Sequence, residues 1–311
     1  MAKREIDLNR CLFHYTNVTC SHCETICPKQ AIKNREIDAG KCDNCGLCTA
    51  ICPTGAIHSD TDYDNALTAV QNLDPQVLMC QKTAPDSLPC LGALNRRLLW
   101  ALADQKPLAI DTSHCASCNP AVAKWLEQEI AACNEALQEA GKAPLKLVRV
   151  KAAPAPAPSV PRRSFFRSLF TAAKEGATEI AAAQVEHRYA FDPVIWLAKQ
   201  TPPVKPAALF PGLALKSPCN SCGLCTMLCP EKALALTKPS DNAPASLQFS
   251  PIKCTACGLC TGNCPQQALE LLPKFQGASS FPLDVQPPSK PSKPSKPSKP
   301  SACDSFKLSR G

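Results

Sequence analysis

The stretch Cys219-Asn-Ser-Cys222-Gly-Leu-Cys225-Thr-Met-Leu-Cys229-Pro230 has the spacing C-x2-C-x2-C-x3-C-P. The chain contains two further complete copies, at 254–265 and 42–53, and an altered copy at 20–28. The copies end almost alike, as CPEKAL, CPQQAL, CPTGAI and CPKQAI. Internal repetition of this kind indicates that one small structural unit is used several times.

These copies resemble the cluster-binding runs of bacterial ferredoxins that hold two [4Fe-4S] clusters. The resemblance covers residues 1–63 and 206–275, and it implies two short β-hairpins and two short helices in each module. It also implies crossed ligation, in which the fourth cysteine of each run binds the other cluster of the pair. The implied C-terminal ligand sets are Cys219, Cys222, Cys225 and Cys264 for one cluster, and Cys254, Cys257, Cys260 and Cys229 for the other.

Structural zinc is the main alternative for such cysteines, and disulfides are a weaker one. Zinc sites usually combine two C-x2-C pairs that are separated by a long gap. Here a complete run places four cysteines between residues 219 and 229. We therefore expect iron–sulfur clusters. The glycine after the second cysteine of each complete run, Gly46, Gly223 or Gly258, is expected to allow a close approach of the backbone.

The N-terminal module departs from the family pattern at one ligand. The resemblance implies one cluster on Cys42, Cys45, Cys48 and Cys27, and a second on Cys20, Cys23 and Cys52. Asn17 occupies the position where the fourth ligand of the second cluster is expected. Cys11 is the candidate replacement if the loop 12–19 folds back. The alternatives are a cluster with three cysteines and an open iron, or a cluster that has been lost.

Residues 64–151 are expected to form a small α/β domain. The patterning predicts helices over 64–73, 91–103 and 120–140, and strands over 76–80, 107–111 and 145–150. Strands that alternate with helices favour a small parallel sheet.

Four cysteines of this region, Cys80, Cys90, Cys115 and Cys118, are predicted near strand ends and helix starts. Sites in parallel sheets form at the carboxyl edge, so these cysteines are candidates for a fifth metal centre, iron–sulfur or zinc. A helix N-terminus is also expected to lower the thiol pKa of the C-x-x-C pair. The alternative is a thioredoxin-like redox pair with two unrelated thiols. Cys133, inside the long helix, is expected to be a buried free thiol.

The remaining segments are interpreted as connectors. Residues 152–205 are expected to form a Pro-rich linker with an amphipathic helix at 162–174, followed by an extended connector over 186–205. The helix packs on its own chain, docks a partner or lies on a membrane surface. A surface loop is expected at 238–251 and a disordered basic Ser-Lys-Pro tail over 276–311.

The expected fold class is therefore α+β, with two bacterial ferredoxin-like 2[4Fe-4S] modules flanking a small α/β domain. Twenty-two cysteines in 311 residues, with only 5% aromatic residues, suit modules in which clusters replace part of the core. The net charge of +8 favours acidic protein partners or an anionic surface, and no motif supports nucleic-acid binding. The sequence shows no apolar run of membrane-spanning length and no signal-peptide pattern, so we expect a cytoplasmic protein.

The expected function is that of a polyferredoxin, which carries single electrons between redox protein partners. The sequence has no dinucleotide-binding motif after a strand and no acid–base constellation, so no catalytic residues are assigned and no enzyme activity is expected. The alternative is an electron-transfer subunit or maturation factor of a dehydrogenase or hydrogenase complex. A third reading is an enzyme that acts at the irregular cluster or at the Cys115–Cys118 pair.

Overall fold

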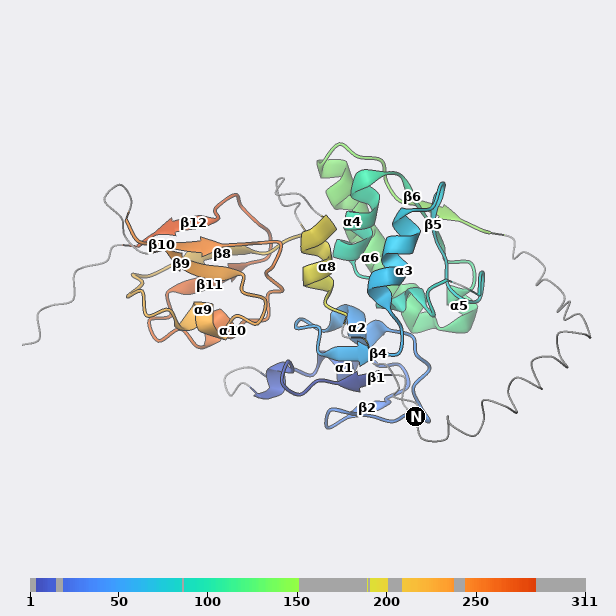
Figure 1. Ribbon diagram of the computed structural model, residues 1–311, viewed down its shortest axis with the longest axis horizontal. Helices are drawn as coiled ribbons and strands as arrows, with labels where there is room; N and C mark the ends of the chain where they lie inside the picture. Colours follow the sequence, from blue (N-terminus) through green and yellow to red (C-terminus); the bar gives the residue numbers. More distant parts are fainter. Residues whose placement is uncertain are drawn as a thin grey trace, which may run out of the picture.

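The computed structural model describes residues 4–14, 19–85, 87–150, 189, 191–200, 209–237 and 244–283. The C-terminal module lies at one end of the molecule, and the N-terminal module and the middle domain lie together at the other (Figure 1). The expected linker at 152–161, the amphipathic helix at 162–174 and the tail beyond 283 lie outside the described residues.

The N-terminal module contains two small antiparallel sheets and two short helices. Strand β1 (Arg4–Ile6) pairs with β4 (Ile57–Ser59), and β2 (Ile32–Lys33) pairs with β3 (Glu36–Ile37). The two α-helices are α1 (His22–Ile26) and α2 (Leu47–Ile51), and a 3-10 helix, η1 (Leu12–His14), precedes them. Asn34 and Arg35 both have positive φ, at 51° and 64°, as the tight turn between β2 and β3 requires.

The C-terminal module repeats this plan. Strand β8 (Gly212–Leu215) pairs with β11 (Leu269–Leu272), while β9 (Leu234–Thr237) pairs with β10 (Ser246–Phe249). Its helices are α9 (Leu224–Leu228) and α10 (Leu259–Gly262). In each module only one of these pairs is a hairpin, because β1–β4 and β8–β11 join strands that are far apart in the sequence. The expectation of two hairpins per module was therefore wrong.

Two expectations about the C-terminal module need correction. The segment 238–251 is not entirely a surface loop, since β10 lies within it and buries Leu247 and Phe249 at alternate positions. The tail does not begin at 276, since β12 (Ser280–Pro282) pairs with β10 and Leu283 is buried. In both segments apolar residues occur at every second position, which is the pattern of a β-strand with one buried face.

The middle domain is built on a three-stranded parallel sheet in the order β5-β6-β7. The strands are β5 (Gln76–Leu78), β6 (Leu108–Asp111) and β7 (Lys146–Val148), and the helices are η2 (Leu91–Ala93) and α3 (Tyr63–Gln71), α4 (Arg96–Gln105), α5 (Cys115–Cys118) and α6 (Pro120–Glu139). The single helix predicted over 91–103 is divided into η2 and α4, because the Asn95 side chain caps α4 by accepting from the amides of Arg97 and Leu98.

The extended connector predicted over 186–205 is contradicted by helix α8 (Pro193–Gln200). Asp192 starts this helix, since its carboxylate accepts from the amides of Val194 and Ile195, and Pro193 suits the first helical position. Trp196 is fully buried, with 0% exposure. The prolines around this segment favour an extended connector, but the buried apolar residues Val194, Trp196 and Leu197 within it form one face of a helix.

The hydrophobic core explains why α8 lies where it does. One apolar cluster joins Leu47 of the N-terminal module, Tyr63 and the middle domain, Trp196 of α8, and Phe210. A separate cluster around Leu247 and Phe249 forms the core of the C-terminal module. The N-terminal module keeps a small core of its own around Ile32 and Ile57, and through Leu47 it also joins the core of the middle domain, to which α8 and Phe210 belong.

Candidate iron–sulfur sites

Each complete cysteine run folds into the same tight turn. Gly46, Gly223 and Gly258 precede helices α2, α9 and α10 with φ of 83°, 76° and 82°, which is the left-handed region that glycine adopts without strain. The residue before the second cysteine of each run also has positive φ. In the altered copy, by contrast, Ser21 precedes α1 with φ of −131°. The repeat therefore specifies a backbone shape as well as a cysteine spacing.

The shared ending of the four copies has a structural role. In every copy the backbone N–H of the alanine after C-P-x-x donates to the Sγ of the fourth cysteine. The four N···S distances are 3.3 Å at Cys27, 3.3 Å at Cys52, 3.2 Å at Cys229 and 3.3 Å at Cys264. Hydrogen bonds to sulfur favour the thiolate form and raise the reduction potential of a cluster bound to it.

The C-terminal cysteines line two separate cavities. We call the cavity lined by Cys229, Cys254, Cys257 and Cys260 site C, and the one lined by Cys219, Cys222, Cys225 and Cys264 site D. Burial and the nearby thiols raise the pKa of Cys260 to about 12 and that of Cys225 to about 11. Both groupings match the crossed sets that the ferredoxin resemblance implies.

Cys27, Cys42, Cys45 and Cys48 of the N-terminal module form site A. Burial raises the pKa of the Cys48 thiol; nearby Arg4 lowers it, while Cys42 and Cys27 raise it further. Burial likewise raises the pKa of Cys45, and Cys48 is among the groups that add to this shift. The other three thiols of site A therefore lie within electrostatic range of Cys48.

Cys11 lines one cavity together with Cys20, Cys23 and Cys52, which we call site B. Burial raises the pKa of Cys23 to about 12, and the thiols of Cys52, Cys48, Cys20 and Cys11 contribute in the same direction. Cys11 therefore lies where the fourth thiol of site B is needed, whereas Asn17 lies outside the described residues.

The donor sets suit cubane clusters. Within the described part of the chain, no three Cys, His, Asp or Glu side chains lie close enough together to bind one metal ion. A cubane has no such requirement, because each of its four cysteines binds a different iron. When bound, the clusters would supply one-electron redox chemistry. The raised thiol pKa values mean that iron must displace the protons as it binds.

We predict that Cys11→Ala removes the cluster of site B or converts it to a three-iron form. The substitution takes away one of the four thiols that line this cavity, while the Cys11 amide can still donate to the Asp7 carbonyl. Anaerobic iron and sulfide analysis together with EPR would show the loss. Cys133→Ala is the matched control, since Cys133 is a buried thiol outside sites A–D. Unchanged iron and EPR in the Cys11 variant would instead favour three-cysteine ligation.

The structure also gathers the four candidate cysteines of the middle domain. Burial raises the pKa of Cys115 to about 11, and Cys90, Cys80 and Cys118 add to the shift. The expected lowering of the pKa at Cys115 was therefore wrong, because burial and neighbouring thiols outweigh the effect of a helix N-terminus. Cys133 is fully buried, as expected, and burial raises its pKa to about 12.

Arg10 joins the two ferredoxin-like modules. Its guanidinium contacts Asp192 at 2.5 Å and Glu231 at 3.3 Å, and its Nε donates to the Thr54 carbonyl at 2.8 Å. Burial, followed by the nearby Asp192 carboxylate, raises the pKa of Glu231 to about 7. Thr54 lies two residues after Cys52 and lines site B, and Glu231 lies two residues after Cys229 and lines site C. The Arg10 network therefore links the linings of these two sites.

Arg97 forms a second connection, from α4 to the C-terminal module. Its Nη1 donates to the Cys254 carbonyl at 2.8 Å, and its guanidinium lies 5.3 Å from the centre of the Phe210 ring. Neither Arg10 nor Arg97 was singled out in the sequence, because a single arginine outside a motif carries no pattern that indicates its contact.

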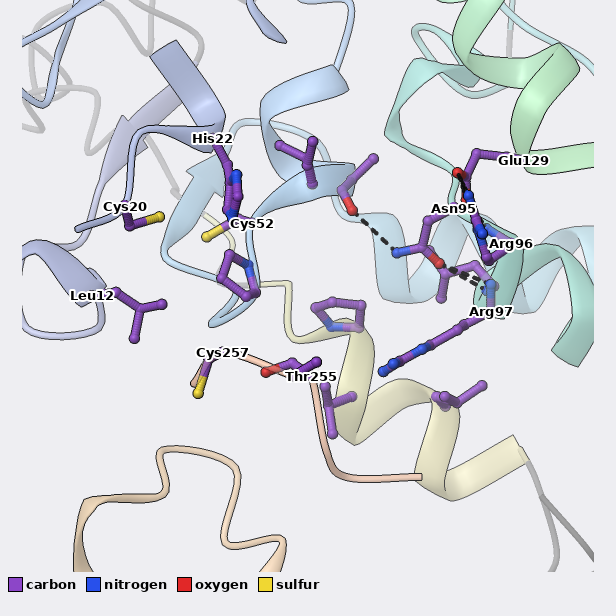
Figure 2. Close-up of a pocket in the computed structure, with 18 of the residues that line it drawn as sticks. Leu12, Cys20, His22, Cys52, Asn95, Arg96, Arg97, Glu129, Thr255 and Cys257 are labelled. Atoms are coloured by element: carbon purple, nitrogen blue, oxygen red, sulfur yellow. Dashed lines mark hydrogen bonds and ion pairs between the residues drawn. The ribbon is translucent and has the colours of Figure 1, made fainter. Parts of the chain in front are cut away.

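A cavity of about 410 Å³ lies between sites B and C. Cys20 and Cys52 of site B line one side of it and Cys257 of site C lines another, with Arg97 extending toward Thr255 (Figure 2). Arg96, beside Arg97, is held by its ion pair with Glu129 at 2.7 Å. The two ferredoxin-like modules therefore face each other through their cysteine-bearing turns.

Two family models match the chain. A 4Fe-4S dicluster domain matches residues 218–268, and an LdpA Fe-S cluster-binding domain matches residues 18–63. The chain thus carries two ferredoxin-like iron–sulfur modules of the electron-transfer type, as the cysteine runs predict. No curated relative matches the chain. Among the described helices, none is both long and apolar enough to cross a bilayer.

Proposed function

We propose that the protein is a polyferredoxin in which four clusters form one row across the two modules. The observation that carries this proposal is the cavity bordered by Cys20 and Cys52 on one side and by Cys257 on the other. Two ferredoxins that acted independently would not need their ligand turns to face each other.

The order of the row follows from the contacts between sites. Sites A and B are neighbours, because helix α1, which carries Cys23, packs against helix α2, which carries Cys48. Sites B and C border the shared cavity. Sites C and D are neighbours, because helix α9, which carries Cys225, packs against helix α10, which carries Cys260. The row is therefore A, B, C, D, and a single electron can move along it in short steps.

Site D is the exposed end of this row in the C-terminal module. The Cys222 side chain is exposed, and Met227 on α9 is 81% exposed beside Cys225. A flexible apolar side chain next to an exposed cluster suits a transient contact with a redox protein. We propose that one electron partner docks here.

A cytoplasmic location suits this function. Every described cysteine is a free thiol, as expected in a reducing compartment. The alternative function, an electron-transfer subunit or maturation factor of a dehydrogenase or hydrogenase, uses the same row, with residues 162–174 as a docking segment for a partner or a membrane surface.

The proposal is tested by a reductive titration of the anaerobically purified chain. We expect reversible uptake of at least about four electrons, one for each cubane cluster at sites A–D, and their complete return to an added acceptor. Clusters that cannot be cycled would contradict an electron carrier. Turnover of a small molecule by the pure chain would favour an enzyme, and purification in a stable complex with a dehydrogenase would favour the subunit function.

A further inference from the structure

The carboxyl edge of the β5-β6-β7 sheet brings two distant cysteines together. Strands β5 and β6 are parallel and hydrogen-bonded, with Leu78 opposite Ile110. Cys80 follows Leu78 by two residues, and Cys115 follows Ile110 by five. Neighbouring strands lie about 5 Å apart, so the chain leaves the sheet at adjacent points just before these two cysteines.

The loop after β5 returns Cys90 to the same edge. Cys80 forms a parallel β-bridge with Leu88, and the Gln81 amide donates to the Leu88 carbonyl at 2.8 Å. Thr83 Oγ1 donates to the buried Asp111 carboxylate at 3.0 Å, which fastens this loop to the end of β6. The convergence is therefore built by backbone pairing and a buried hydrogen bond.

The four thiols at this edge influence one another electrostatically, and we call them the middle-domain quartet: Cys80, Cys90, Cys115 and Cys118. Cys80 and Cys115 are both buried, with 7% exposure, while Cys118 is exposed at the end of α5. Cys115 lies within electrostatic range of the other three, and Cys90 lies within range of Cys80 and Cys118. Cys133, on α6, is absent from these interactions and stands apart.

The quartet lies directly beside site A. A Cβ atom added to Gly92 would lie 2.4 Å from the Cys45 carbonyl oxygen, so η2 and the site A turn are in close contact. Asn119, which follows Cys118, donates from its side chain to Asp43 at 2.9 Å. Burial raises the pKa of the Tyr63 hydroxyl, and the thiols of Cys48 in site A and Cys90 in the quartet both add to this shift.

We propose that the middle-domain quartet binds a fifth iron–sulfur cluster, a cubane, which extends the row beyond site A. All four donors are thiols, the ligands that iron–sulfur clusters use. Like sites A–D, the quartet offers only cysteine donors, and among the described residues no three metal-binding side chains lie close enough to hold a single ion. A structural zinc ion would need a tighter tetrahedron and would gain nothing from lying beside a redox centre. Neither of the two family matches reaches these residues.

The test compares metal content in the anaerobically prepared full chain and its variants. We expect about twenty irons in the wild type and about sixteen in Cys80→Ser/Cys115→Ser, because each cubane carries four irons. Cys133→Ser, which alters another buried thiol of the same domain, should keep about twenty. Cys118→Ser alters an exposed ligand, so it should lose the same cluster or convert it to a three-iron form with the fold intact.

Equal iron in the wild type and the Cys80/Cys115 variant would overturn the proposal, as would loss of one zinc ion per chain in that variant. The difference between these two proteins reports on the quartet alone. If both proteins instead fell short of their expected iron content by the same amount, while their difference of about four irons remained, the result would count against sites A–D and the proposed function.

Discussion

Cys229→Ala is expected to destroy the cluster of site C while leaving that of site D in place. Cys229 lies in the same run as Cys219, Cys222 and Cys225, yet its side chain lines the cavity of Cys254, Cys257 and Cys260. Loss of one of four thiolates should remove up to about four irons per chain. Iron and sulfide analysis would measure this loss.

Double variants identify which cluster is lost. Cys229→Ala/Cys257→Ala alters site C twice, so it should lose no more iron than complete loss of one cluster. Cys229→Ala/Cys222→Ala alters sites C and D, so it should lose about eight irons. Ligation within a single run would reverse the two results, and that outcome would contradict the crossed arrangement.

Arg4→Met is expected to lower the reduction potential of the cluster at site A. Arg4 is 1% exposed, and it donates to Thr49 Oγ1 and to the Tyr63 hydroxyl, both at 2.6 Å. Among the described residues no carboxylate forms an ion pair with it. Burial alone would lower the pKa of this guanidinium, but Tyr63, Cys48 and Cys42 raise it above its ordinary value. A buried cation without a carboxylate partner is costly unless an anionic group lies nearby, and a cluster held by four thiolates is such a group.

The expected size of the shift follows from electrostatics. A unit charge at about 8 Å contributes about 2 kcal/mol at an effective dielectric constant of about 20. For a one-electron couple this is about 90 mV. Arg4→Lys keeps the charge and should keep most of the potential. EPR-monitored potentiometry would separate the variants, and a methionine variant with full iron content and the wild-type potential would show that Arg4 has only a packing role.

The sequence predicted which cysteines would line the same cavities at sites B, C and D, because the cysteine runs repeat one spacing that resembles a known family. The turn glycines and the C-P-x-x-A ending were also visible, and their roles became clear once φ at Gly46, Gly223 and Gly258 and the N–H···S bonds were known. The parallel order of β5, β6 and β7 followed from alternating helices and strands, and it brought distant cysteines to one edge.

The relation between the modules could not be predicted in the same way. It depends on single side chains such as Arg10, Arg97 and Trp196, whose partners lie up to 221 residues away in the sequence and follow no period. The prolines around 193–200 favour an extended connector, whereas the structure forms α8 there, because the helix buries Trp196 and Leu197 against the rest of the chain. Tertiary packing decides such segments more than local propensity does.

The central claim is that sites B and C belong to one row of clusters across the module interface. The most direct test is the EPR spectrum of the fully reduced chain, compared with the summed spectra of fragments 1–205 and 206–283. Magnetic interactions within each module occur in both samples, so the difference isolates the interaction across the cavity between Cys52 and Cys257. The row predicts broadened, faster-relaxing signals in the intact chain, whereas a spectrum equal to the sum of the fragments, at equal iron content, would contradict it.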